Sequence, residues 1–107
     1  MQRPLDLAEL RQFRRNPLRA YAFVHGPGGF QPVTIIDYSQ AGLQLDETFG
    51  LFQGNLIEIE FMSGIQVSGR VVWCLGARAG IVFSEALSDA HPAMSELETR
   101  RALHQRS

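Results

Sequence analysis

Arginines crowd one short stretch near the beginning of this 107-residue chain. Within "RRNPLR", residues 14–19, three positions are arginine: Arg14, Arg15 and Arg19. Pro17 argues against a helix here, because a proline pushes the residue before it toward extended geometry. A guanidinium is a planar fork of donors whose geometry fits an anion such as a phosphate. The stretch therefore predicts an anion clamp, with an ordinary solvated charge run as the alternative.

A second polar cluster, "DYSQAG" at residues 37–42, lies between the apolar runs "VTII" and "LQL". Asp37 and Ser39 offer short acceptors near a tight turn, and Gly42 allows a positive φ or a close approach of another backbone. The alternative is an Asx-type turn in which these side chains cap only their own backbone.

Alternating apolar residues and glycine-rich turns predict the elements that position these clusters. About six short strands are expected, over residues 20–25, 30–37, 43–46, 55–62, 65–75 and 80–84. "GPGG" at 26–29 predicts a hairpin between the first two. In the fifth strand, Val71 and Trp73 are expected to face the core together. A helix is expected over residues 92–105, and a short helix at 5–13 as an optional addition. The pattern indicates an all-β antiparallel barrel or sandwich with a terminal helix.

Composition indicates one domain over residues 1–107, divided into an N-terminal arm (1–19), a barrel (20–85) and a C-terminal helical segment (86–107). The formal net charge of −1 argues against general binding to polyanions, although all ten basic residues are arginine. No apolar run is long enough to span a bilayer, so membrane insertion is not expected. The single cysteine, Cys74, cannot form an internal disulfide, which favours a cytoplasmic location.

Motifs of catalysis and of metal binding are not found. His25, His91 and His104 lie far apart and show no metal-ligand spacing with Cys74. The sequence contains no G-x-S-x-G, and the "GPGG" turn lacks the Lys-Ser/Thr of a phosphate loop. We therefore expect neither an enzyme, nor a cofactor, nor a bound metal.

The two polar clusters together carry a family resemblance. R-x-x-x-R (Arg15 to Arg19, preceded by Arg14) followed by D-x-S-x-x-G resembles the PilZ domain family. The later runs "GNLIEIEF", "VSGRVVW" and "GIVF" extend the resemblance over about residues 12–85. The resemblance implies a six-stranded barrel with a helix after the last strand, and a receptor for the bacterial messenger cyclic di-GMP. It places the ligand-binding residues at Arg14, Arg15, Arg19, Asp37, Ser39 and Gly42.

A receptor of this kind is expected to change conformation on binding cyclic di-GMP, with residues 11–19 closing over the ligand, and to signal to an unidentified downstream protein. Homodimerisation is a further option for its assembly. One alternative is a PilZ-like adaptor that contacts proteins and binds no nucleotide. Another is a small barrel that binds single-stranded nucleic acid, which would need exposed stacking aromatics. Phe61, Trp73 and Phe83 are instead expected in the core, so a nucleic-acid polymer is not the expected partner.

Overall fold

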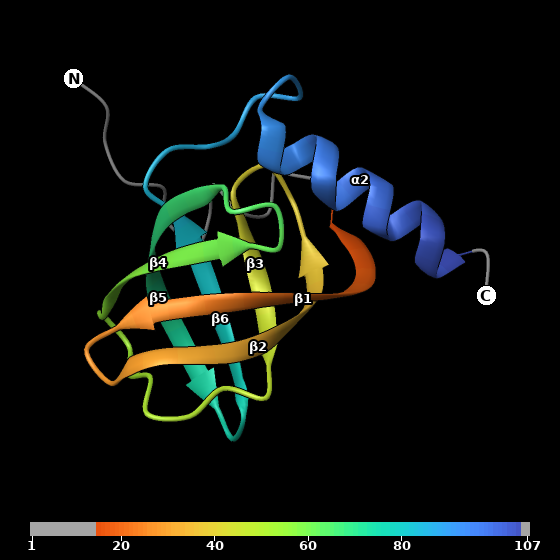
Figure 1. The fold of residues 1–107 in the computed structure, drawn as a ribbon. Helices are drawn as coiled ribbons and strands as arrows, with labels where there is room; N and C mark the ends of the chain where they lie inside the picture. Colours follow the sequence, from red (N-terminus) through yellow and green to blue (C-terminus); the bar gives the residue numbers. More distant parts are fainter. Residues whose placement is uncertain (1–14, 106–107) are drawn as a thin grey trace.

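Six antiparallel strands close into a barrel in the computed structural model, which describes residues 15–105 (Figure 1). The strands are β1 (Asn16–Gly26), β2 (Gly29–Tyr38), β3 (Gly42–Asp46), β4 (Leu56–Phe61), β5 (Gln66–Leu75) and β6 (Arg78–Phe83). Their order around the barrel is β1-β2-β3-β6-β5-β4, and pairing of β4 with β1 completes the closure. The predicted fold class, a six-stranded antiparallel barrel, is confirmed.

Along each strand, every second side chain points into the barrel, and these inward-facing side chains form the core. Apolar side chains from all six strands are at most 2 % exposed; they include Val24, Ile35, Leu45, Ile59, Val71 and Ile81. Burying a side chain of this kind contributes roughly 1.5–3 kcal/mol relative to leaving it exposed. Phe61 and Phe83 lie in this core, as the alternation predicts.

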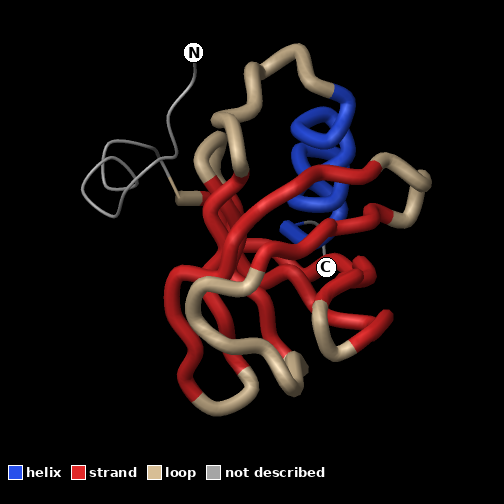
Figure 2. The backbone as a smooth tube through the Cα atoms, turned by 90° about the vertical axis from the view of Figure 1, so that its left-hand side faces the viewer, coloured by secondary structure: helices blue, strands red, loops and turns tan. Residues whose placement is uncertain are grey.

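Helix α2 (Pro92–Gln105) packs beside the beginning of β1 (Figure 1), and Figure 2 shows the helix against the strands of the barrel. Its buried residues, Ala93, Met94 and Leu97, join one apolar cluster with Leu18 of β1. The helix matches the predicted range of 92–105. No helix among residues 15–105 is long and apolar enough to cross a membrane. The optional helix at 5–13 lies outside the described residues.

Strand β1 begins at Asn16, four residues before the predicted start of the barrel. Leu18 is only 3 % exposed and continues the inward alternation of Ala20, Ala22 and Val24, which draws this segment onto the barrel. Pro17 pairs with Asp37, and the register then shifts before Ala20, as expected where a proline enters a sheet. Residues 16–19 are therefore part of the first strand rather than of a separate arm.

A second irregularity turns one aromatic side chain outward. The register of β5 against β6 shifts between Val71 and Trp73, so Val71 pairs with Ile81 while Trp73 pairs with Gly80. An extra residue in one strand reverses the face of the residues that follow it. Val71 stays in the core, whereas Trp73 is half-buried on the outer surface. The prediction that Trp73 faces the core is wrong for this reason.

Candidate ligand-binding site

Arg15 and Asp37 meet where β1 begins and β2 ends. Their segments are adjacent because Pro17 pairs with Asp37 and Asn16 pairs with Tyr38. The Arg15 Nε donates to Asp37 Oδ2 at 3.0 Å, with the two side chains 36 % and 19 % exposed. Two residues separated by 22 positions in the sequence, one from each predicted cluster, thus form an ion pair. A surface pair of this kind contributes only about 0–1 kcal/mol to stability.

The second carboxylate oxygen of Asp37 has unused acceptor capacity. Oδ1 is buried and accepts no hydrogen bond from the described residues. Leaving a buried acceptor unsatisfied costs about 1–3 kcal/mol, so most buried polar atoms in proteins are paired. Asp37 therefore offers an acceptor that a bound donor could use, once a neighbouring group moves to let it in.

Ser39 forms the turn that connects β2 with β3. Its side chain is fully buried, and its Oγ accepts from the backbone N–H of Ala41 at 3.1 Å. The backbone N–H of Ser39 donates to the carbonyl of Gly42 at 2.9 Å. This arrangement matches the alternative interpretation, a side chain capping its own turn. Direct contact of Ser39 with a ligand stays a prediction.

Gly42 lies against the neighbouring strand β6. A Cβ atom at this position would come within 1.9 Å of the carbonyl oxygen of Ile81 and 3.2 Å of the Cα of Val82. Both obstructing atoms belong to the backbone, so they cannot turn aside as a side chain could. The close approach of two strands is enough to require glycine here, and a role in leaving space for a ligand is an additional prediction.

The remaining predicted site residues are arginines. Arg19 lies in β1 between Pro17 and Ala20, where the register shifts, and it is exposed. It shares the outer side of this part of the barrel with the Arg15–Asp37 pair, while Leu18 beside it points inward. Arg14 lies outside the described residues.

The turn that carries the site is also tied to helix α2. Tyr38, between Asp37 and Ser39, is fully buried, and its hydroxyl accepts a hydrogen bond from Arg101 Nε at 3.2 Å. Arg101 in turn forms an ion pair with Glu98 at 3.1 Å. Burial raises the pKa of Tyr38, and a hydrogen bond with Glu98 raises it further. Sequence reasoning missed this link, since nothing in the pattern of the helix pairs Arg101 with a tyrosine 63 positions earlier.

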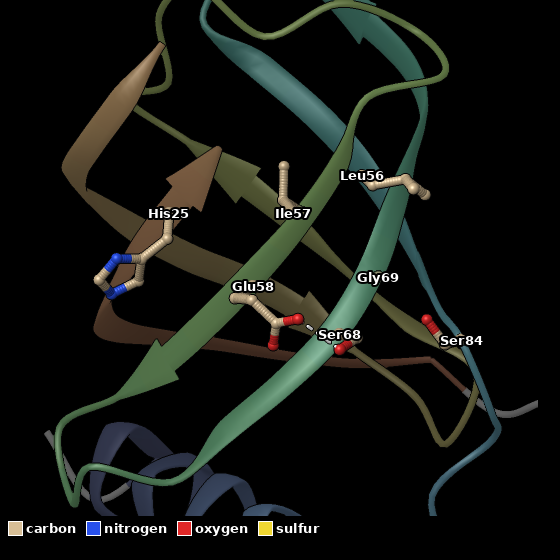
Figure 3. Close-up of a pocket in the computed structure, with 7 residues that line it drawn as sticks. All are labelled: His25, Leu56, Ile57, Glu58, Ser68, Gly69 and Ser84. Carbon is tan, nitrogen blue, oxygen red and sulfur yellow. Dashed lines mark hydrogen bonds between the residues drawn. The ribbon is translucent and has the colours of Figure 1, made fainter. Parts of the chain in front are cut away.

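A hollow of about 330 Å³ lies elsewhere, beside β4 and β5 (Figure 3). Its lining includes His25 and Glu58, and Glu58 accepts a hydrogen bond from Ser68. The Glu58 carboxylate would repel an anionic ligand, and the lining contains no arginine. The hollow is therefore less suited to a phosphate than the surface around Arg15 and Arg19. Among the described residues, no group of histidine, cysteine and acidic side chains could hold a metal ion.

Comparison with known proteins agrees with the fold. A family model described as "PilZ domain" matches residues 9–99. Among solved structures, the chain is similar to the PilZ domain of CeSA from a cellulose-synthesizing bacterium, with a TM-score of 0.60 and 14 % sequence identity. The match covers 84 % of this chain and 97 % of that chain. No curated protein matches the sequence significantly.

Proposed function

Because this chain belongs to the PilZ domain family, we propose that it is a receptor for cyclic di-GMP and that it signals to a partner protein from the cytoplasm. The observation that carries the proposal is the Arg15–Asp37 pair, in which the buried Oδ1 of Asp37 has no hydrogen-bond partner among residues 15–105. Cyclic di-GMP has groups that are complementary to both side chains. Its two phosphates can bind guanidinium groups, and the donor edges of its two guanines can bind a carboxylate.

Each side chain then has a separate task. Asp37 accepts from the N1–H and the amino group of one guanine, which uses both carboxylate oxygens. Arg15 and Arg19 donate to phosphate or to the O6/N7 edge of a guanine. Arg14, which lies outside the described residues, is proposed as a third donor. Ser39 and Gly42 contribute mainly by fixing the backbone that holds Asp37 in place.

Binding requires movement of side chains more than of the strand. Arg15 occupies one oxygen of Asp37, and the other oxygen is buried, so Arg15 must move before a guanine can bind both. The backbone of residues 16–19 is already paired in β1 and anchored by Leu18. We therefore propose that the Arg15 side chain leaves Asp37 and binds the ligand instead. The resulting shift at Asp37 would reach helix α2 through the neighbouring Tyr38, whose hydroxyl is hydrogen-bonded to Arg101.

An adaptor that binds no nucleotide is the second candidate. The observation in its favour is that Ser39 and Gly42 each have a structural task in the described turn. Two residues of the D-x-S-x-x-G motif therefore need no ligand to account for them. This alternative does not explain Asp37, whose Oδ1 is buried without a hydrogen-bond partner in the described part of the chain.

Equilibrium binding of labelled cyclic di-GMP tests the proposal. The wild-type chain should bind the messenger and should not bind a short single-stranded oligonucleotide of equal charge. Arg15→Ala should weaken binding at least about tenfold, because a hydrogen bond to a charged group contributes about 1.5–3 kcal/mol. Arg78→Ala is the matched control, since Arg78 also faces an aspartate, Asp46 at 3.9 Å, at the far end of the barrel. Equal weakening by both variants, or no binding by the wild type, contradicts the proposal.

A further inference from the structure

Aromatic side chains cover the outer face of strands β1 and β2, where an antiparallel sheet commonly presents polar groups to water. Tyr21 is 67 % exposed and Phe30 is 56 % exposed, and Phe23 is half-buried beside Phe30. Pro32, which is exposed and pairs with Phe23, completes an apolar surface two strands wide. We call these four residues the aromatic strip. In Figure 1, β1 and β2 cross the front of the barrel and α2 lies to one side of them.

Packing within the sheet accounts for only part of the aromatic strip. The rings of Phe23 and Phe30 stack with centroids 4.8 Å apart and an angle of 15° between their planes. Such cross-strand aromatic contacts stabilise a hairpin. Stacking does not explain why Tyr21 and Phe30 keep more than half of their surface in water. Contiguous exposed apolar surface marks interaction sites, and aromatic residues are enriched in protein interfaces.

Strand β4, on one side of the aromatic strip, presents carboxylates next to it. Glu60 pairs with Phe23 and Glu58 pairs with His25, and both glutamates alternate with core residues and so face outward. His25 Nε2 lies 2.8 Å from a carboxylate oxygen of Glu60. Figure 3 shows His25 and Glu58 on neighbouring strands beside the hollow described above, where the Glu58 carboxylate would attract a cationic side chain. Two carboxylates and at most one imidazolium lie at this edge, so its charge is negative.

Strand β3, on the other side of the aromatic strip, ends in two further carboxylates. Asp46 pairs with Thr34, which itself pairs with Tyr21. Glu47 follows Asp46 and accepts a hydrogen bond from the Thr34 hydroxyl at 2.7 Å. Arg78 lies 3.9 Å from Asp46 and offsets one of these charges. The aromatic strip is therefore bordered by negative charge on both sides.

The spacing of these two acidic edges matches the width of one α-helix. Strands β4, β1, β2 and β3 are consecutive in the barrel, so the edges lie about three strand spacings, or roughly 14 Å, apart. A helix with its side chains has a diameter of about 10–12 Å. Apolar side chains on one face of such a helix would cover the aromatic strip. Lysine or arginine side chains on its two flanks would reach the carboxylates.

We propose that the aromatic strip is the docking surface for a basic amphipathic helix of a partner protein. The inference rests on the proposed function in that it names the surface used by the partner to which the receptor signals. Arg19 lies on the same outer side of β1, two residues before Tyr21, so the proposed ligand site and this surface are neighbours. The acidic edges decide the kind of partner. They repel anionic lipid and nucleic acid, and between two copies of this chain they would meet identical carboxylates.

Fluorescence anisotropy of the full chain with a labelled helical peptide tests the inference in the absence of cyclic di-GMP. The probe is a peptide of about 18 residues with leucines on one face and lysines on both flanks. The wild type should bind it with a micromolar Kd and should not bind the same peptide with glutamate in place of lysine.

Tyr21→Thr and Phe30→Thr should each weaken binding of the basic peptide at least about tenfold, because aromatic side chains at the centre of an interface contribute most of its affinity. Threonine keeps a high strand propensity, so both variants should fold. Leu75→Thr is the matched control, since Leu75 is 78 % exposed on β5, on the opposite side of the barrel, and should change the affinity less than about twofold.

The contribution of the acidic edges is tested separately. Glu58→Gln should weaken binding by up to about fivefold and should lessen its dependence on salt, because a surface charge pair contributes little and is screened. Glu85→Gln removes an exposed carboxylate from the segment after β6 and should leave the affinity unchanged.

Equal affinity of the wild type for both peptides, no binding of the basic peptide, or unchanged binding by folded Tyr21→Thr and Phe30→Thr overturns the inference. If neither variant folds, amide exchange of the wild type decides, since unchanged protection across residues 21–34 and 58–60 on adding the basic peptide also overturns it. Dissociation of a wild-type dimer by Tyr21→Thr in sedimentation, or displacement of the peptide by phosphatidylglycerol vesicles, would assign the strip to another occupant and overturn it too. Because no measurement includes cyclic di-GMP, failure here leaves messenger binding intact, and failure of messenger binding leaves the docking surface intact.

Discussion

Replacing Gly42 with alanine should damage the fold rather than the ligand contacts. The added Cβ would lie 1.9 Å from the Ile81 carbonyl oxygen, a separation that real Cβ atoms do not show. Since Gly42 pairs with Val82, relief of the clash requires β3 and β6 to separate at this pair. The backbone conformation of Gly42 lies outside the left-handed region, so the effect is one of space alone.

The structure sets the size of this effect. Overpacking of a well-packed interior costs typically 1–3 kcal/mol, and obstruction by backbone atoms places Gly42→Ala at about 3 kcal/mol or more. For a domain near 100 residues, each 1 kcal/mol lowers the melting temperature by about 4 °C or more. We therefore expect a decrease of at least about 12 °C, measured by circular dichroism.

Gly28→Ala is the control for this experiment. Its added Cβ would meet only the Gly50 carbonyl oxygen at 3.7 Å, an ordinary contact, so its melting temperature should stay within about 2 °C of the wild type. If Gly42→Ala melts with the wild type yet binds no cyclic di-GMP, the reasoning is refuted. Gly42 would then be required by the ligand and not by β6.

Three further outcomes are expected. Because burial raises the pKa of Tyr38, the folded state holds the phenol proton more tightly than the unfolded state does. The stability that this provides should be intact below about pH 10 and should fall as the pH rises through the raised pKa. In urea unfolding, Tyr38→Phe should remove this pH dependence. Burial also raises the pKa of the Cys74 thiol, whose Sγ donates to the Leu51 carbonyl at 3.1 Å, so a thiol reagent at neutral pH should react more slowly with the folded chain than with free cysteine. Arg15→Ala should lower the free energy of unfolding by less than about 1 kcal/mol, since its ion pair is at the surface; a larger loss would make Arg15 a structural residue.

Much of this fold could be predicted from local patterns. Alternation placed residues such as Ile59 and Phe61 in the core, and the "GPGG" turn joined β1 and β2, where Gly29 has a φ of 103°. The start of β1 was missed because Pro17 and the arginines around it are not typical of a strand, whereas pairing with β2 at Asp37 stabilises one here. Trp73 was misplaced because a register shift depends on the partner strand and leaves no sign in the alternation.

The sequence predicted which types of residue form the site and in what order they occur, but it did not predict the contacts that these residues make. The two polar clusters indicated which side chains to consider, and the barrel brings Arg15 and Asp37 within 3.0 Å. The tasks of Ser39 and Gly42 depend on the backbone of the turn and of β6, which come from tertiary packing. The link from Tyr38 to Arg101 likewise depends on how α2 packs against the barrel.

Calorimetric titration of the wild-type chain and Asp37→Asn with cyclic di-GMP tests the central claim most directly. The asparagine keeps the shape of Asp37 but replaces one acceptor oxygen with a donor, which would face the donors of guanine. We expect saturable binding by the wild type, and at least about tenfold weaker binding by Asp37→Asn at a melting temperature close to that of the wild type. Equal affinity of the two proteins for cyclic di-GMP, or no binding by the wild type, would contradict the assignment of Asp37 as the residue that recognises the messenger.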